Sequence, residues 1–186
     1  HRLAEEYRRK GASVLVSTTT HMLVEPDTDL SCDSFAVMEK IKKTGYCMAG
    51  AVCPENSAKM QSLPEQMLHD LMKQVDYALI EADGAKHYAL KYPSEQEPVI
   101  PEGTTDVILV LGSWDLGKPC KDVVFRFEHM TSALGISGDM KADKQMLQWI
   151  WQAYEEKLKN MDYQGHFHVL LSEKTDQGLV FHTLKE

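Results

Sequence analysis

Short apolar runs recur along the chain, and each of them ends in polar residues. The runs cover residues 13–17, 76–81, 105–111 and 167–171. Continuous apolar runs of this length are typical of strands that are buried on both faces of a parallel sheet. We therefore expect these segments to be neighbouring, mostly parallel strands of one sheet, with their polar carboxyl ends converging on one edge.

The stretches between these runs carry apolar residues at helical spacing. Leu3 and Tyr7 lie one turn apart among charged residues, and Gly11 is expected to end that helix. Ser62 followed by Glu65 has the form of a capping box at the start of a second helix. Residues 22–42 are ambiguous, and the segment 33–45 is compatible with a short helix that Gly45 ends. A strand or hairpin limb is expected over 45–55. A long amphipathic helix is expected over 139–161, with Met146, Ile150, Tyr154 and Leu158 on one face.

This alternation of strands and helices indicates an α/β fold with a mostly parallel sheet flanked by helices. No internal repeat or low-complexity linker divides the chain, so residues 1–186 are expected to form a single domain. In such folds ligands bind beyond the carboxyl ends of the strands. The polar stretches that follow the apolar runs are therefore the places where a site is expected.

Charge and cysteine content narrow the class of function. A formal net charge of −8 argues against binding a nucleic-acid polymer, which favours a basic protein face. No apolar stretch approaches the ~20 residues that span a bilayer, so no contact with a membrane is expected. The four cysteines, Cys32, Cys47, Cys53 and Cys120, form no C-x-x-C pair. Reduced thiols and a cytoplasmic protein are therefore expected.

One stretch has the spacing of a nucleotide-binding phosphate loop. Gly112 and Gly117 flank four residues and are followed by Lys118, directly after an apolar run. A working loop needs Ser or Thr at the next position, because that hydroxyl ligates magnesium. Pro119 stands there instead and lacks an N–H group, and Asp115 lies where the anion would sit. A structural turn without bound phosphate is the favoured interpretation.

The segment LIEADGAK carries a more informative pattern. An apolar strand delivers Glu81 and Asp83 to its end, and Gly84 follows. P-loop-type enzymes hold magnesium or orient a water in this way. Both carboxylates are therefore candidate catalytic residues and metal ligands. The alternative is an ordinary turn from strand to loop with solvated carboxylates.

Hydroxyl side chains follow the first of the apolar runs. Thr18, Thr19, Thr20 and His21 stand in succession at its carboxyl end. Such side chains can bind phosphate, magnesium or water, although threonine is also a common strand residue.

His166 and His168 lie on one face of the last predicted strand and suggest a metal site. An H-x-H pair without a third ligand is more often a surface pair or an internally satisfied one. Cys47 and Cys53 make no stronger case as metal ligands.

Four segments in a fixed order resemble a known family. They are VLVSTTTHM (14–22), EADGAK (81–86), EQEPVIP (95–101) and LGKP (116–119). Their order and rough spacing are similar to those of the YqeC-like proteins over nearly the whole chain, and EADGAK followed by EPVIP is the most specific part. YqeC-like proteins are regarded as accessory proteins of selenium-dependent molybdenum hydroxylases.

The resemblance implies a fold and a cofactor. It implies a nucleotide-binding domain with the three-layer sandwich of P-loop NTPases, which binds Mg²⁺ with ATP or GTP. The family's phosphate loop is expected before His1, so LGKP late in the chain is not that loop. Glu81 or Asp83 would hold the magnesium, directly or through water. The phosphate side would be lined by Thr18, Thr19, Thr20, His21, Gly84 and Lys86.

The resemblance also implies partners, but it does not determine what the bound nucleotide is used for. The expected partners are the nucleotide and a molybdenum hydroxylase or its cofactor. The nucleotide can serve in three ways: ATP or GTP hydrolysis, phosphoryl transfer or a conformational switch. Two other functions are open as well: a non-catalytic scaffold or chaperone with a nucleotide-binding-type fold, and a small-molecule kinase. Glu173 stands where a base-reading Asn-Lys-x-Asp motif has Asn, so the choice of nucleobase is also open.

Overall fold

The computed structural model describes residues 2–24, 28 and 30–185. The chain forms two compact units that alternate along the sequence. The first unit comprises His1–Gly84 and Val99–Gly103, and the second comprises Ala85–Pro98 and Thr104–Glu186. That residues 1–186 act as a single domain stays a prediction.

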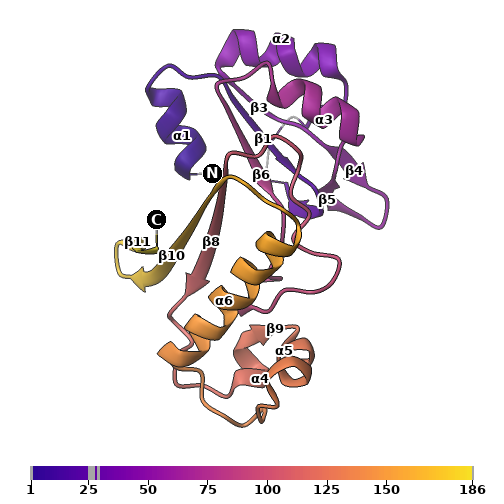
Figure 1. Cartoon of the computed structure of the whole chain (residues 1–186). Helices are drawn as coiled ribbons and strands as arrows, with labels where there is room; N and C mark the ends of the chain where they lie inside the picture. Colours follow the sequence, from indigo (N-terminus) through magenta and orange to yellow (C-terminus); the bar gives the residue numbers. More distant parts are fainter. Residues whose placement is uncertain (1, 25–27, 29, 186) are drawn as a thin grey trace. The chain divides into compact units, whose positions relative to one another are not determined.

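A three-stranded parallel sheet organises the first unit (Figure 1). Its strands, in spatial order, are β3 (Tyr46–Met48), β1 (Val14–Thr18) and β6 (Tyr77–Glu81). The register pairs Thr18 with Glu81, so β1 and β6 end side by side. The predicted strands 13–17 and 76–81 are thus confirmed as parallel neighbours.

Helices flank this sheet. The described helices of the first unit are α1 (Arg2–Arg9), α2 (Ser34–Thr44) and α3 (Glu65–Met72). The side chain of Asp33 accepts a hydrogen bond from the backbone N–H of Ala36 and begins α2. Gly45 ends α2 with a φ of 72°, a conformation that glycine adopts without a steric cost. The short helix that Gly45 was expected to end is therefore confirmed.

The predicted capping box of α3 is not formed. Pro64 is the N-cap residue and has no side-chain hydrogen bond to the helix. The hydroxyl of Ser62 donates instead to the carbonyl of Leu63, at 2.8 Å. The S-x-x-E spacing is present, but the helix begins at Glu65 with Pro64 as its N-cap residue, so Ser62 stands two residues too early to cap it.

Both faces of the parallel sheet are covered. Side chains of successive strand residues point to opposite faces, so Leu15 points away from Val14 and Val16. Leu15 packs with α2 and α3 in one cluster: Val37, Ile41, Cys47, Ala49, Leu63, Leu68 and Leu71. Val14 and Val16 pack in another with Ala4 of α1, Met48 and Met60. The first unit therefore has helices on one face of the sheet, and α1 with β5 on the other.

A small antiparallel sheet completes the first unit. Its strands, in spatial order, are β2 (His21–Leu23), β5 (Asn56–Gln61) and β4 (Ala51–Cys53). The predicted strand or hairpin limb over 45–55 thus contains the two short strands β3 and β4.

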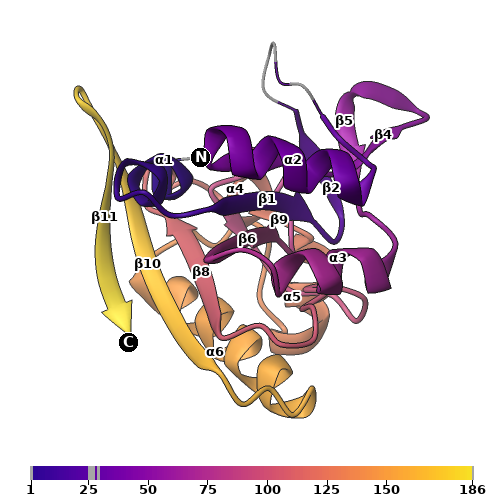
Figure 2. The ribbon, with the colours of Figure 1, turned by 90° about the horizontal axis from the view of Figure 1, so that it is seen from above.

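A second, separate sheet organises the second unit (Figure 2). Its strands, in spatial order, are β11 (Gly178–Lys185), β10 (His166–Thr175) and β8 (Asp106–Gly112). Strands β8 and β10 are parallel, whereas β10 and β11 are antiparallel. The predicted strands 105–111 and 167–171 are therefore confirmed as parallel neighbours.

The prediction of one sheet with four neighbouring strands is wrong, because β1 and β6 pair in one sheet and β8 and β10 in another. Burial of β8 on both faces is also wrong. Leu109 and Leu111 face the core, whereas Ile108 and Val110 are 46% and 48% exposed. An apolar run shows what a strand can bury, but it does not specify the strand with which it pairs.

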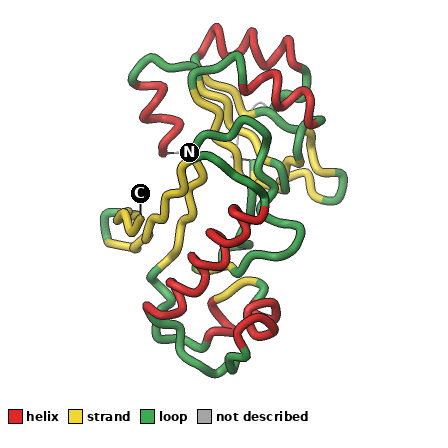
Figure 3. The backbone as a smooth tube through the Cα atoms, in the orientation of Figure 1, coloured by secondary structure: helices red, strands yellow, loops and turns green. Residues whose placement is uncertain are grey.

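One long helix covers the inner face of this second sheet (Figure 3). It is α6 (Lys144–Asn160), and its N-cap Asp143 accepts a hydrogen bond from Met146 N at 3.0 Å. Met146, Ile150, Tyr154 and Leu158 are buried, as their spacing predicted. The remaining elements of this unit are α4 (Cys120–Val123), α5 (Phe127–Leu134) and the parallel pair β7 (Leu90–Lys91) and β9 (Val124–Phe125).

The protein is therefore an α/β protein with several mostly parallel sheets flanked by helices. Within the described residues, no helix combines the length and the apolar character needed to cross a membrane.

Candidate functional site

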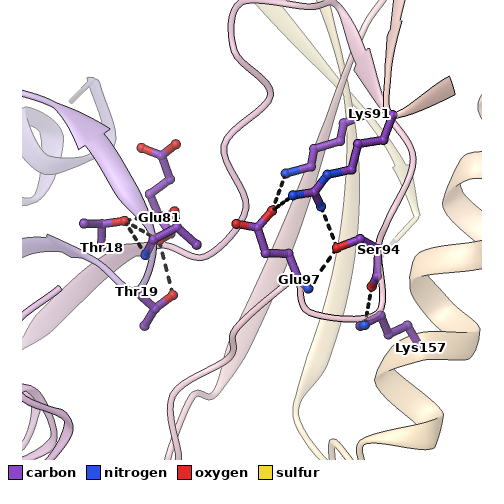
Figure 4. A network of polar contacts seen from close by, with 9 residues as sticks. Thr18, Thr19, Glu81, Lys91, Ser94, Glu97 and Lys157 are labelled. Atoms are coloured by element: carbon purple, nitrogen blue, oxygen red, sulfur yellow. Dashed lines mark hydrogen bonds and ion pairs between the residues drawn. The ribbon is translucent and has the colours of Figure 1, made fainter. Parts of the chain in front are cut away.

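The carboxyl ends of β1 and β6 meet at the polar residues that the sequence singled out (Figure 4). The hydroxyl of Thr18 donates to the carbonyl oxygen of Glu81 at 2.9 Å, and the backbone N–H of Thr19 donates to the same oxygen at 3.0 Å. Two parallel strands thus present a threonine turn and an acidic segment at one edge of the sheet.

The three threonines form a compact turn. The Thr18 hydroxyl accepts a hydrogen bond from Thr20 N at 3.0 Å and lies 3.3 Å from the Thr20 hydroxyl. Thr18 is fully buried, and its hydroxyl is engaged as donor and acceptor. Its observed contacts therefore hold the turn together, while Thr19 and Thr20 are only partly buried.

Thr19 also fastens a distant part of the chain to this edge. Its hydroxyl donates to the carbonyl of Val99 at 2.7 Å. The N–H of Val99 donates in turn to the carbonyl of Ala82 at 3.1 Å. The segment Val99–Gly103 belongs to the first unit for this reason, and it lies beside the loop that follows β6.

Gly84 lies close to the carboxylate of Glu81. A Cβ atom at Gly84 would stand 2.9 Å from Glu81 Oε1 and 3.7 Å from the backbone oxygen of His21. A real Cβ almost never approaches an atom so closely, so the carboxylate would have to move. The structure therefore brings Glu81, Gly84 and the backbone of His21 together, with Asp83 partly buried in the same loop.

Lys86 belongs to the second unit. It is exposed, and its ammonium lies 4.9 Å from the centre of the Phe125 ring. The EADGAK segment thus contributes its carboxylates to one unit and its lysine to the other.

The donor atoms of the first unit suit Mg²⁺. Carboxylate and hydroxyl oxygens are the ligands of this hard cation, which is usually held by one or two carboxylates together with waters and substrate phosphates. Among the described residues, no group of three or more His, Cys, Asp or Glu side chains could hold a metal ion. Glu81 and Asp83 therefore fit a magnesium ion that arrives with a phosphate ligand rather than a protein-only metal centre.

The stretch with phosphate-loop spacing is a turn, as expected. Lys118 pairs with Asp115 at 2.5 Å, and Gly117 has a φ of 91°. The ring of Trp114 fills the space where a side chain at Gly112 would lie, which explains that glycine. Pro119 is the N-cap residue of α4. That this turn binds no phosphate stays a prediction.

The two histidines of β10 form a surface arrangement. Their ring centres lie 6.2 Å apart, and His168 Nε2 lies 2.9 Å from Asp106 Oδ1. The hydrogen bond with His168 is the main reason that the pKa of Asp106 is below its ordinary value. The four cysteines are all free, with Cys32 exposed and the others buried.

Sequence analysis missed a polar cluster in the second unit (Figure 4). Glu97 Oε2 lies 2.9 Å from Lys91 Nζ and 2.7 Å from Arg126 Nη2. Glu97 lies within the EQEPVIP segment, but no spacing rule links it to an arginine 29 positions away. The excess of positive charge in the cluster arises from the pairing of β7 with β9, which brings Lys91 beside Phe125.

Comparisons with known proteins place these observations in a family context. The model of the family described as "YqeC protein" matches residues 1–128. The "Uncharacterized protein YqeC" of Escherichia coli (strain K12) is 31% identical over 145 residues. This match covers 74% of the chain but only 56% of that curated relative, so the chain spans little more than half of its length. No solved structure matches the chain.

Proposed function

Because the chain belongs to the YqeC family, we propose that it binds a nucleoside triphosphate with Mg²⁺ and serves in the maturation of a selenium-dependent molybdenum hydroxylase. The name of the Escherichia coli relative states no activity. The proposed maturation role therefore rests on the family resemblance of the sequence alone. The nucleotide-binding part of the proposal rests on the first unit, and a cytoplasmic location is part of the same proposal.

One observation carries the nucleotide proposal. Thr18 and Glu81 are register partners at the carboxyl ends of two parallel strands, and the loops that follow both strands are joined by hydrogen bonds. Ligands of open α/β sheets bind at this edge because the loops diverge there. Hydroxyls and carboxylates at that edge are suited to a magnesium–phosphate ligand.

The side chains divide into roles by their contacts. Glu81 or Asp83 holds magnesium, directly or through water, and the bound ion offsets the negative charge of the phosphates. Thr18 holds the turn in shape, because its hydroxyl already serves two backbone groups. Thr19 and Thr20 lie on the phosphate side, and His21 and Gly84 contribute backbone there.

The finer fold proposal is a P-loop NTPase-like three-layer sandwich. The first unit supports it, because a parallel sheet there is covered on both faces. In such proteins a separate loop of backbone N–H groups and a lysine bind the phosphates. We place that loop before His1, on the family resemblance of the sequence. The turn from Gly112 to Lys118 does not take its place.

Calorimetry with ATP and GTP, with and without magnesium, tests nucleotide binding. A chain extended by such a phosphate loop before His1 is expected to bind in the micromolar range, and the 186-residue chain in the millimolar range. Each lost hydrogen bond to a charged group costs about 1.5–3 kcal/mol, and about 1.4 kcal/mol changes affinity tenfold. Equally tight binding by the shorter chain would place the phosphate site within it and reopen the case for Lys118.

Two substitutions identify the magnesium ligand. Asp83→Asn and Glu81→Gln are compared in the extended chain, with Glu65→Gln on the exposed start of α3 as the control. The ligand is the residue whose substitution weakens binding only when magnesium is present. If neither form of the protein binds either nucleotide, the scaffold function replaces this proposal. Phosphoryl transfer to a small molecule would identify a kinase.

The maturation role has its own test. A bacterium that makes a selenium-dependent molybdenum hydroxylase is deprived of this protein, and the hydroxylase is purified. We expect normal amounts of hydroxylase polypeptide with a deficit of selenium or molybdenum. Full metal and selenium content, measured by mass spectrometry, would refute the role without affecting the nucleotide proposal.

A further inference from the structure

Three cationic side chains surround one aromatic ring in the second unit. The centre of the Phe125 ring lies 4.9 Å from Lys86 Nζ, 5.3 Å from Lys91 Nζ and 5.4 Å from Arg126 Cζ. Cations within about 6 Å of a ring are attracted to the negative potential over its face. Positive charge is therefore concentrated at one point of a chain whose net charge is −8.

The pairing of β7 with β9 builds this cluster. The parallel register places Lys91 directly beside Phe125, and Tyr92 N donates to the carbonyl of Phe125 at 3.1 Å. The side chain of Lys91 is only 5% exposed. A buried ammonium is costly unless an anion meets it, so the position requires negative charge nearby.

One carboxylate holds two of the cations. Glu97 Oε2 lies within ion-pair distance of both Lys91 and Arg126 (Figure 4). Within the part of the chain that the structure describes, Lys86 has no ion pair, and its ammonium lies against the Phe125 ring. The carboxylate thus keeps the cations gathered, and Lys86 adds a positive charge that Glu97 does not contact.

The backbone around the cluster is held in an unusual conformation. Arg126 has a φ of 62° and Lys86 a φ of 47°, which residues other than glycine seldom adopt. Arg126 Nη1 donates to the hydroxyl of Ser94 at 2.6 Å, and Lys157 of α6 donates to the carbonyl oxygen of Ser94. Such conformations persist where surrounding contacts enforce them, and they concentrate at ligand sites.

We propose that the cluster of Lys86, Lys91 and Arg126 binds the phosphoryl group of free phosphate or of a phosphomonoester. A planar guanidinium matches phosphate oxygens, and two ammonium groups add charge from other directions. Arg126 also precedes α5, whose amino end carries positive partial charge and reinforces the attraction for an anion. Glu97 keeps the cations in position before the anion arrives.

Titration of the isotope-labelled 186-residue chain with sodium phosphate tests this site. The solution contains no magnesium, its ionic strength is constant, and the side-chain Nε–Hε signal of Arg126 is followed by NMR. We expect a saturable shift. Lys86→Met should weaken binding at least about tenfold, as expected for one hydrogen bond to a charged group. Phenyl phosphate is titrated separately, and the tighter of the two ligands identifies the source of the phosphoryl group.

Lys174→Met is the matched control. Lys174 lies 4.6 Å from the centre of the Trp114 ring in the same unit, so its loss also removes an exposed ammonium from an aromatic ring. Binding should be unchanged in that variant.

An Arg126 signal that does not saturate would overturn the proposal, and so would equal losses in Lys86→Met and Lys174→Met. The test is independent of the nucleotide proposal, since it uses no magnesium and reports on the second unit.

Discussion

Thr18 occupies a position where a hydroxyl connects two strands and closes a turn. Its hydroxyl donates to the Glu81 carbonyl and accepts from Thr20 N, and the residue has no exposed surface. A desolvated N–H group that loses its acceptor costs free energy, and the N–H of the partly buried Thr20 depends on this hydroxyl. The side chain is therefore required for the geometry on which the candidate site depends.

Thr18→Val tests this role, because valine keeps the shape and the strand propensity but removes the hydroxyl. We expect the free energy of unfolding to fall by about 1–3 kcal/mol, since Thr20 N is left without its partner. Urea denaturation followed by circular dichroism measures the change. Thr20→Val should cost less, because the hydroxyl of Thr20 makes one long contact, of 3.3 Å, to the hydroxyl of Thr18. Equal losses in the two variants would contradict the assignment.

Gly84→Ala tests the close approach of the backbone to Glu81. The added methyl group should displace the flexible carboxylate and weaken magnesium-dependent nucleotide binding in the chain extended by a phosphate loop, while circular dichroism stays unchanged. Combination with Glu81→Gln gives a double-mutant cycle measured by calorimetry. If the methyl group acts through the carboxylate, the two losses should not add. Full additivity would show that Gly84 acts elsewhere.

Caps at helix ends show where local sequence rules succeed and where they fail. Asp33 begins α2 and Gly45 ends it, as the rules require. Each of the two residues makes its capping hydrogen bond with a residue three or four positions away in the sequence. Ser62 and Glu65 have the right spacing, but Pro64 sets the helix start. The spacing of side chains was readable from the sequence, whereas the backbone angles that make a cap were not.

Asp33→Ala and Ser62→Ala should therefore differ in effect. The first removes an N-cap hydrogen bond at 2.8 Å and is expected to cost about 0.5–2 kcal/mol. The second removes a hydroxyl that donates only to the adjacent carbonyl, so a change within about 0.5 kcal/mol is expected. Thermal and urea unfolding measure both. A larger loss of unfolding free energy for Ser62→Ala would show that Ser62 caps α3 after all.

Strands β1 and β6 are fastened at their amino ends by a reciprocal contact. Asp76 Oδ2 accepts from Ser13 N at 2.8 Å and from the Ser13 hydroxyl at 2.7 Å, and Asp76 N donates to that hydroxyl at 2.9 Å. The backbone hydrogen bond, followed by the hydroxyl, lowers the pKa of Asp76 below its ordinary value of 3.8. The stabilisation is fully present above that value and is lost as the pH falls through the lowered pKa of the folded state.

Asp76→Asn should lower the urea midpoint at pH 7, because the amide accepts weaker hydrogen bonds than the carboxylate. The difference from the unsubstituted chain should shrink as the pH falls below 3.8, where the carboxyl group becomes protonated. Glu65→Gln, an exposed change in the first turn of α3, serves as the control. A difference that is independent of pH would exclude the charge as its cause.

At the scale of the whole molecule, the sequence predicted the α/β class and the parallel pairs but not the division into sheets. The apolar runs of β1, β6, β8 and β10 were visible because burial leaves a compositional signal. Which runs pair depends on contacts between residues far apart in sequence. Arg126 and Glu97 were missed for the same reason, since their contact depends on the pairing of β7 with β9.

A chelator should leave the melting temperature of the nucleotide-free chain unchanged. Among the described residues, no cluster of three metal-ligating side chains is present, and magnesium is expected to arrive with a phosphate ligand. Differential scanning calorimetry with and without EDTA measures this. A melting temperature that falls with EDTA and recovers with a metal ion would reveal a resident metal.

Each of the two units is made of two separate segments of the chain, and this has an evolutionary consequence. The five residues Val99–Gly103 are anchored to the first unit through Val99, whereas the segments before and after them belong to the second. No single crossover in the gene could transfer one unit without part of the other. The two units are therefore expected to have been inherited together, and not to have been exchanged singly between the genes of unrelated proteins.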